Sequence, residues 1–252
     1  MRETKEDELL KRRLRELADK CYKNNMYTFT DFLSLADLSV YYDIERELNF
    51  VEATPWGGNE ICERKILRFG SEKQLGFSED FPITTLCIKP LMQKFADNLS
   101  HRDILGSLMN LGIEREVLGD IFLVDNVAYL FCLHNMAHYI CQSLTRVRHT
   151  TVMCSIVEEI PSLDATDKTE KLIQVNSERL DGVIAKVCNL SRSQCALLFT
   201  QRKVFINGRL CENSSRTLKE KDIVTVRGFG RFTYLGISGT TKKGKLNIVV
   251  EM

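Results

Sequence analysis

Residues 77–160 show the clearest alternation of hydrophobic and polar positions in the chain. Apolar, β-branched and aromatic runs predict strands, and apolar positions at helical spacing predict two helices between them. In the first helix, Ser100 suits the N-cap, Asp103 the third helical position and Gly112 the end. We expect a strand over 81–89, a helix over 100–112, strands over 120–124 and 128–132, a helix over 134–144 and a strand over 150–157. This β-α-β-β-α-β order is that of ferredoxin-like and RNA-recognition-motif domains.

The N-terminal residues 1–75 have a less regular pattern. A charged helix is expected near residues 5–22, and Ser34 with Asp37 predicts the start of a second helix. The stretches 49–53 and 64–69 predict a pair of strands. This segment therefore reads as a small α+β domain.

The pattern changes again after residue 160. Residues 161–176 are polar and predict a linker. Apolar positions over 180–187 form one helical stripe, and Ser191 predicts the N-cap of a helix over 192–201. Strands are expected at 204–208, 223–227, 232–236 and 246–250. The expected fold class is α+β with three small domains: an N-terminal domain (1–75), a domain like an RNA-recognition motif (77–160) and, after the linker, an αα-β module (177–252).

Composition excludes several classes of protein. The 252 residues are 44% hydrophobic and 27% charged, with 14 Gly and 4 Pro, which argues against collagen, low complexity and general disorder. No apolar run approaches the roughly 20 residues that a membrane helix needs. The first eight residues are charged where a signal peptide would be apolar. We therefore expect a cytoplasmic protein without membrane contact.

The net charge of +1 hides a strong asymmetry between two parts of the chain. Residues 177–252 hold 14 Lys and Arg against 6 Asp and Glu, a net charge of +8, whereas residues 1–176 have a net charge of −7. A basic C-terminal third on an acidic remainder is typical of a polyanion-binding module on a scaffold. The alternative is a solvated basic surface without a partner.

Three local patterns resemble reactive or metal sites, and none is convincing. His101-Arg102-Asp103 is similar to the catalytic loop of protein kinases, but the expected Asn is Leu108 and no Gly-rich loop occurs. Cys132, His134, His138 and Cys141 have ligand chemistry, but the histidines flank the apolar stripe of their helix. Arg179-Leu180-Asp181 resembles the Arg-Leu-Asp of pseudouridine synthases, without a second carboxylate or a suggested pocket. We predict no catalytic residues, no metal and no cofactor, and no small-molecule substrate.

The nine cysteines are odd in number and include no Cys-x-x-Cys. In a chain without an export signal, such cysteines are expected to be reduced thiols.

The most specific pattern lies between residues 177 and 231. It comprises Arg179-Leu-Asp, Ser191-Arg-Ser-Gln, Val204-Phe-Ile-Asn-Gly and Asp222-Ile with Arg227-Gly. This pattern resembles the S-four RNA-binding domain, a family named after a small-subunit ribosomal protein. The chain departs from the family at Arg202 and Lys221, where the family usually has glycine.

The same residues suit phosphate binding on physical grounds. The helix that begins after Ser191 offers free N–H groups and the positive end of its dipole to an anion. Guanidinium and ammonium groups nearby can bind phosphate oxygens, and such contacts read the backbone more than the bases. The expected RNA-binding residues are Arg179, Arg192, Ser193, Gln194, Arg202, Lys203, Arg227, Arg231, Lys242 and Lys243.

With this module in view, the rest of the chain resembles the bacterial YlmH family. The stretch from His101 to Ile121 is similar to the family's signature, and Gly57-Gly58, Glu63-Arg64 and Thr30-Asp-Phe-Leu33 match its N-terminal part. The resemblance implies a non-enzymatic RNA-binding protein of the cytosol, acting on the large ribosomal subunit. Its expected partners are ribosomal RNA and peptidyl-tRNA on stalled particles, and its expected state is a monomer.

The central domain carries candidate secondary contacts. Tyr129 and Phe131 lie two apart on one strand and so share a face, as base-stacking aromatics do, and Arg102 and Arg115 are candidates for a local RNA contact. However, no RNA-recognition consensus surrounds the aromatics, and residues 77–163 have a net charge of −4. A protein-contacting or structural role is therefore favoured for this domain.

The sequence is also compatible with two other functions. One is an RNA-modifying enzyme that uses the S-four module only for targeting. The other is a protein-interaction scaffold, for example in cell division, whose basic surface is incidental.

Overall fold

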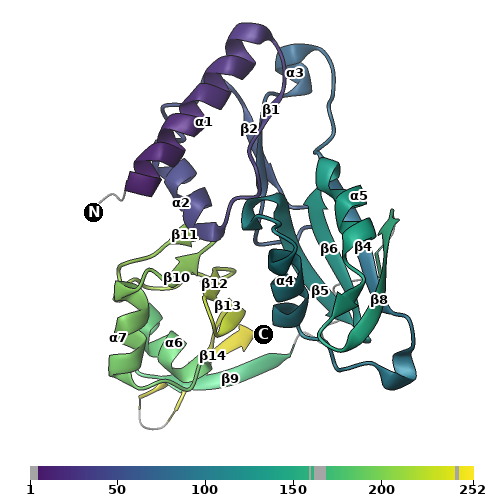
Figure 1. The fold of residues 1–252 in the computed structure, drawn as a ribbon. Coiled ribbons are helices and arrows are strands. Elements are labelled where there is room, and N and C mark those ends of the chain that lie inside the picture. Colours follow the sequence, from purple (N-terminus) through teal and green to yellow (C-terminus); the bar gives the residue numbers. More distant parts are fainter. Residues whose placement is uncertain (1–4, 159, 162–168, 242–243) are drawn as a thin grey trace. The chain divides into compact units, whose positions relative to one another are not determined.

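The computed structural model describes residues 5–158, 160–161, 169–241 and 244–252 (Figure 1). The chain forms two compact units, Met1–Leu163 and Asp164–Met252, and each is described by itself. The fold is mixed α and β with antiparallel sheets, as expected. The N-terminal and central segments lie in one unit, so the boundary near residue 76 remains a prediction. Among the described residues, no helix combines the length and apolar character needed to cross a membrane.

The first part of unit 1 packs two helices against a small sheet of strand order β1-β3-β2. The predicted capping box is confirmed: Ser34 Oγ accepts from the Asp37 N–H, and the Asp37 carboxylate accepts from the Ser34 N–H at 2.8 Å. The strand expected from residue 49 begins only at Ala53, because Leu48 and Val51 enter the core from irregular backbone. The elements are α1 (Lys5–Asn24), β1 (Thr28–Phe29), α2 (Leu35–Ile44), β2 (Ala53–Trp56), β3 (Ile66–Phe69) and α3 (Glu72–Leu75).

The second part of unit 1 has the predicted β-α-β-β-α-β order, with one short extra strand, β7. Its antiparallel sheet has the order β5-β6-β4-β8-β7, so the first strand of the motif lies in the sheet interior. The Ser100–Asp103 capping box is confirmed at the start of α4. Asp125 and Asn126 take positive φ angles of 49° and 64° in the predicted turn. The elements are β4 (Ile83–Pro90), α4 (His101–Asn110), β5 (Leu118–Val124), β6 (Val127–Leu133), α5 (His134–Ser143), β7 (Arg146–Val147) and β8 (Thr150–Val157).

The two faces of this sheet are buried differently. On one face, Leu130 of β6 packs with Ile104 of α4 and Ile140 of α5 in the main core. On the other face, Phe131 packs against Phe32 and other residues of the N-terminal part. The two parts of unit 1 are therefore joined through the sheet face that an RNA-recognition motif would leave open.

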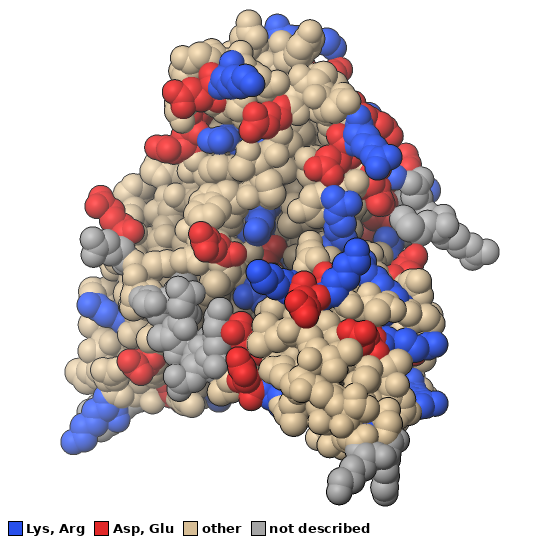
Figure 2. Space-filling view, turned by 180° about the vertical axis from the view of Figure 1, so that it is seen from behind, with Lys and Arg blue, Asp and Glu red and all other residues tan. Residues whose placement is uncertain are grey.

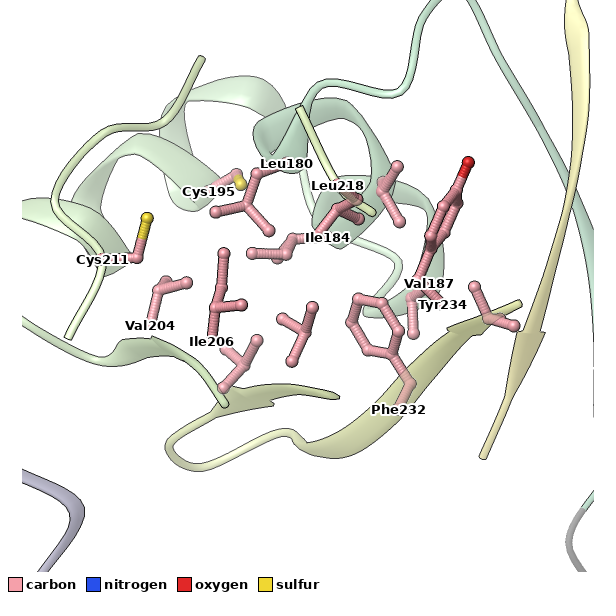
Figure 3. Packing of buried hydrophobic residues seen from close by; sticks show 14 of the residues in the cluster. Leu180, Ile184, Val187, Cys195, Val204, Ile206, Cys211, Leu218, Phe232 and Tyr234 are labelled. Atoms are coloured by element: carbon pink, nitrogen blue, oxygen red, sulfur yellow. The ribbon is translucent and has the colours of Figure 1, made fainter. Parts of the chain in front are cut away.

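Unit 2 packs two helices on one face of a six-stranded sheet of order β11-β10-β12-β13-β14-β9. Leu180 and Ile184 of α6 face Val204, Ile206 and other sheet residues in one apolar core (Figure 3). The elements are β9 (Glu170–Val175), α6 (Leu180–Val187), α7 (Arg192–Thr200), β10 (Val204–Ile206), β11 (Arg209–Leu210), β12 (Ile223–Val226), β13 (Gly230–Thr240) and β14 (Leu246–Glu251).

Part of the predicted linker is a strand. Residues 170–175 form β9, which pairs antiparallel with β14, with Val175 opposite Leu246 and Glu170 opposite Glu251. The linker prediction relied on the polar residues around position 165, but Ile173 and Val175 alternate into the core. The folded part of unit 2 thus begins before Arg179, the start of the predicted RNA-binding pattern.

Candidate nucleic-acid interface

The start of α7 has the predicted capping geometry. Ser191 Oγ accepts from the Gln194 N–H at 3.2 Å, and Gln194 Oε1 accepts from the Ser191 N–H at 2.9 Å. Ser193 Oγ lies 3.1 Å from Ser191 Oγ. The side-chain oxygens of this turn therefore hold the helix end together, while the exposed Arg192, the first helical residue, carries the charge.

This helix end opens onto a groove of about 850 Å³ in unit 2. The end of β9, helix α6 and the first turn of α7 form its walls. Four basic side chains line it, namely Arg179, Lys186, Arg192 and Lys245, together with one acidic side chain, Asp181. The groove thus collects two of the predicted RNA-binding residues, and it adds Lys186 and Lys245.

Arg179 and Asp181 neutralise each other at the rim of the groove. The Arg179 guanidinium donates from Nη2 to Asp181 Oδ2 at 2.7 Å and from Nε to Oδ1 at 3.2 Å. The hydrogen bond from Arg179 lowers the pKa of Asp181, and the same contact raises the pKa of Arg179. Asp181 Oδ1 also accepts from the Gly182 N–H. Both oxygens of the aspartate that resembled a nucleophile are therefore engaged.

Three further predicted residues lie at the sheet instead: Lys203 directly precedes β10, Arg227 directly follows β12, and Arg231 is in β13. Val204, Val226 and Phe232 point into the core, so the alternation of side chains places Lys203, Arg227 and Arg231 on the opposite face. The Arg227 guanidinium lies over the ring of Phe205, 5.2 Å from its centroid. None of the three lines the groove. We call Lys203, Arg227 and Arg231 the basic sheet face.

The two departures from the S-four pattern both have left-handed backbone. Arg202 has a φ of 54° and Lys221 a φ of 69°. Arg202 ends α7 in a Schellman motif: the Lys203 N–H donates to Leu198 O at 2.9 Å and the Arg202 N–H to Phe199 O at 3.0 Å. The turn geometry that glycine would favour is thus kept with long basic side chains, and the Arg202 side chain lies 3.9 Å from Glu212 Oε1.

Lys242 and Lys243, the last two of the predicted RNA-binding residues, lie outside the described residues.

Figure 2 shows basic and acidic side chains interspersed over the face that it displays, so on that face charge alone does not mark a single RNA-binding area.

The candidate secondary contacts of the central domain differ in how accessible they are. Phe131 is only 1% exposed and is held by the N-terminal part, so burial excludes it from stacking on a base. Tyr129 on the same face is partly exposed. The Arg115 guanidinium donates from Nη1 to Leu118 O at 2.6 Å and to Gly119 O at 3.1 Å, which gives it a structural task. Arg102 is exposed on α4.

Arg64 has a structural role, which the sequence indicated only through the Glu63-Arg64 resemblance. Its Nε donates to Leu118 O at 2.8 Å and its Nη2 to Phe32 O at 2.7 Å, which ties the N-terminal part to β5. Asp120 Oδ2 accepts from the Glu63 and Arg64 N–H groups at 2.7 and 2.9 Å. Burial, and next the charge of Arg115, lowers the pKa of Arg64 to about 10.

The histidines considered as metal ligands have other surroundings. His134 Nδ1 lies 2.9 Å from Thr84 Oγ1, and His138 is exposed. Within the described ranges, no three His, Cys, Asp or Glu side chains are grouped to hold a metal ion.

Comparisons with known proteins cover the central segment and, more loosely, the larger part of the chain. Residues 77–160 match the family model described as a putative RNA-binding domain in YlmH. The chain is 29% identical over 199 residues to the ribosome-associated protein quality control protein P2 of Bacillus subtilis (strain 168), covering 77% of this chain and 76% of that protein. Its fold is similar to the structure of the cell division protein YlmH from Streptococcus pneumoniae, with a TM-score of 0.50, 19% identity and coverage of 66% of this chain and 98% of that one. The family-model match and the Bacillus subtilis relative support the YlmH family and an RNA-binding role, and the solved structure shows similarity of fold alone.

Proposed function

We propose that the chain is a non-enzymatic RNA-binding protein of the YlmH family that acts on the ribosome in the bacterial cytosol. In this proposal, residues 177–252 are an S-four module that binds structured RNA. Its targets are ribosomal RNA and peptidyl-tRNA on the large subunit, and its task belongs to ribosome-associated quality control. The match of residues 77–160 and the name of the Bacillus subtilis relative support this reading.

The observation that carries the proposal is the arrangement of cations in unit 2. Arg192 stands at a capped helix start and lines one groove with Lys186 and Lys245, while Lys203 and Arg227 occupy the basic sheet face. Polyanion binding of this kind rests on many phosphate contacts, each of which releases counterions. The rival enzyme function receives no support from Asp181, since Arg179 occupies both of its oxygens.

Co-sedimentation with ribosomes over a series of KCl concentrations tests the proposal. One variant carries Arg192→Glu in the groove and a second carries Lys203→Glu with Arg227→Glu on the basic sheet face. A third combines all three changes. Each lost phosphate contact should flatten the log–log salt dependence by about 0.7 to 0.9. We expect the triple variant to lose most of its association, and the two partial variants show which surface contributes more.

The matched control carries three Glu replacements on helix α1, at the exposed residues Lys5, Arg13 and Lys20. It changes the net charge by the same amount, so it measures the effect of charge alone. Two other basic residues of α1 are not used in the control. Lys11 is buried, and Arg15 forms an ion pair with Glu47 at 2.8 Å. A folded triple variant that sediments like the parent at every salt concentration would refute RNA binding through unit 2 and favour the scaffold.

A further inference from the structure

We propose that the groove of unit 2 binds one unpaired nucleotide, with its phosphate at Arg192 and Lys245 and its base edge at the amides of Gln174 and Asn176. This inference rests on the proposed RNA-binding function and adds selectivity for an unpaired nucleotide to it.

The size of the groove sets the kind of ligand. Pockets of roughly 300 to 1,000 Å³ enclose small organic molecules, and a nucleotide is of that size. The groove measures about 850 Å³. A paired base lies stacked inside its helix and cannot enter such a space, whereas a base in a bulge or loop can be turned outward. The groove therefore suits an extruded nucleotide better than a duplex.

The charge inside the groove suits phosphate. Asp181 is already bound by Arg179. Within the described part of the chain, Lys186, Arg192 and Lys245 form no ion pair and donate no side-chain hydrogen bond. These three cations line the groove together with the start of α7, and the charge of Arg192 also helps to lower the pKa of Asp181.

A second, polar part of the groove lining suits a base edge. Gln174 and Asn176 are exposed at the end of β9 and line the groove. An amide side chain offers donors and an acceptor together, as the edges of bases do. No aromatic side chain lines the groove in the described residues, so recognition there uses hydrogen bonds and not stacking.

The amide-bearing wall of the groove comes from strand β9, which is not part of the predicted phosphate-binding surface. Strand β9 precedes Arg179 and is fixed by its ladder with β14. It therefore lies outside the pattern of residues 179–231 that predicted backbone binding. The added strand gives the basic surface a wall, and Gln174 and Asn176 lie on and directly after a strand whose backbone the ladder with β14 holds in place.

Fluorescence anisotropy with short RNA duplexes tests the inference. One set carries a single-nucleotide bulge, as A, C, G or U, and the reference duplex is fully paired. We expect the parent protein to bind at least one bulged duplex about tenfold more tightly than the paired one, since a good base contact discriminates by about that much. In the Gln174→Leu/Asn176→Leu variant this preference should fall below threefold, with affinity for the paired duplex unchanged. Gln142→Leu removes an exposed amide from α5 in unit 1 and is the matched control.

The outcomes separate this inference from the proposed function. Equal binding of bulged and paired duplexes by the parent protein would overturn the nucleotide site and leave RNA binding standing. This comparison needs no variant, so a folding defect cannot obscure it. No binding of any duplex, together with unimpaired ribosome association of the triple Glu variant, would overturn the proposed function. A folded double variant that keeps the full preference would overturn the role of the two amides.

Discussion

Lys221 offers a direct test of the backbone argument. It is the third residue of a turn in which the Asp222 N–H donates to Lys219 O at 2.9 Å, and its positive φ gives that turn type II character. A residue with a Cβ pays about 1 to 2 kcal/mol in this conformation. Glycine avoids that cost, but its greater conformational freedom stabilises the unfolded chain by about 0.4 to 1 kcal/mol. Lys221→Gly should therefore stabilise unit 2 by about 0.5 to 1 kcal/mol.

Hydrogen exchange read by mass spectrometry measures this effect within unit 2. Peptides covering β12 and β13 should exchange about two to five times more slowly in the variant, if they exchange through opening of the whole unit. Lys219→Gly is the matched control, because Lys219 has no positive φ and its N–H bond to Asp222 Oδ2 survives the change. It should accelerate exchange. The single tryptophan, Trp56, lies in unit 1, so its fluorescence midpoint in urea should stay constant in both variants.

Faster exchange in Lys221→Gly, as in Lys219→Gly, would show that Lys221 carries no backbone strain. Arg202→Gly should also slow exchange, but by less. The half-exposed Arg202–Glu212 pair contributes about 0 to 1 kcal/mol that the glycine variant loses.

Three further predictions concern unit 1. Asp120→Asn should destabilise it by about 1 to 3 kcal/mol, because the half-buried Arg64 loses its nearby carboxylate, and urea unfolding followed by Trp56 fluorescence measures the loss. Gly58→Ala should cost about 2 to 4 kcal/mol in the same assay, since a Cβ there would come within 2.4 Å of the Phe131 ring at a φ of +98°. Burial raises the pKa of the Cys62 thiol to about 12, so at pH 8 its thiolate fraction is about 1,000-fold below that of an ordinary thiol. Iodoacetamide should therefore label Cys62 of the native protein very slowly, and the labelling rate should rise about tenfold for each pH unit. After unfolding without reductant, all nine cysteines should be labelled rapidly.

Each of these has its own control. In Gly76→Ala the added Cβ meets no atom within 4 Å, so the variant should lose only the stability that a Cβ costs at a φ of +81°. A Gly58→Ala loss no larger than that of Gly76→Ala would mean that Phe131 yields easily. Unchanged stability of Asp120→Asn would show that backbone carbonyls alone suffice for Arg64. Two thiols that resist alkylation until reductant is added would reveal a disulfide, for which Cys141 and Cys154, with sulfurs 3.3 Å apart, are the first candidates.

Local signals in the sequence determined the helix starts and the central topology. Ser34 and Ser100 predicted their capping boxes, and Ser191 predicted its N-cap, because a cap and its partner lie close together in the sequence and no distant contact is needed to define them. The alternation over residues 77–160 predicted the strand and helix order for the same reason.

Only the tertiary structure decided what each surface faces. Alternation placed Tyr129 and Phe131 on one face, but it could not show that Phe32 covers part of it. The polar residues before position 170 hid β9, because a strand of six residues is stable only through its distant partner β14. The groove exists for the same reason, since β9, α6 and α7 meet there from separate parts of unit 2. Burial and pairing between residues far apart in the sequence leave no local period, and these interactions turned a predicted basic surface into a groove and a separate sheet face.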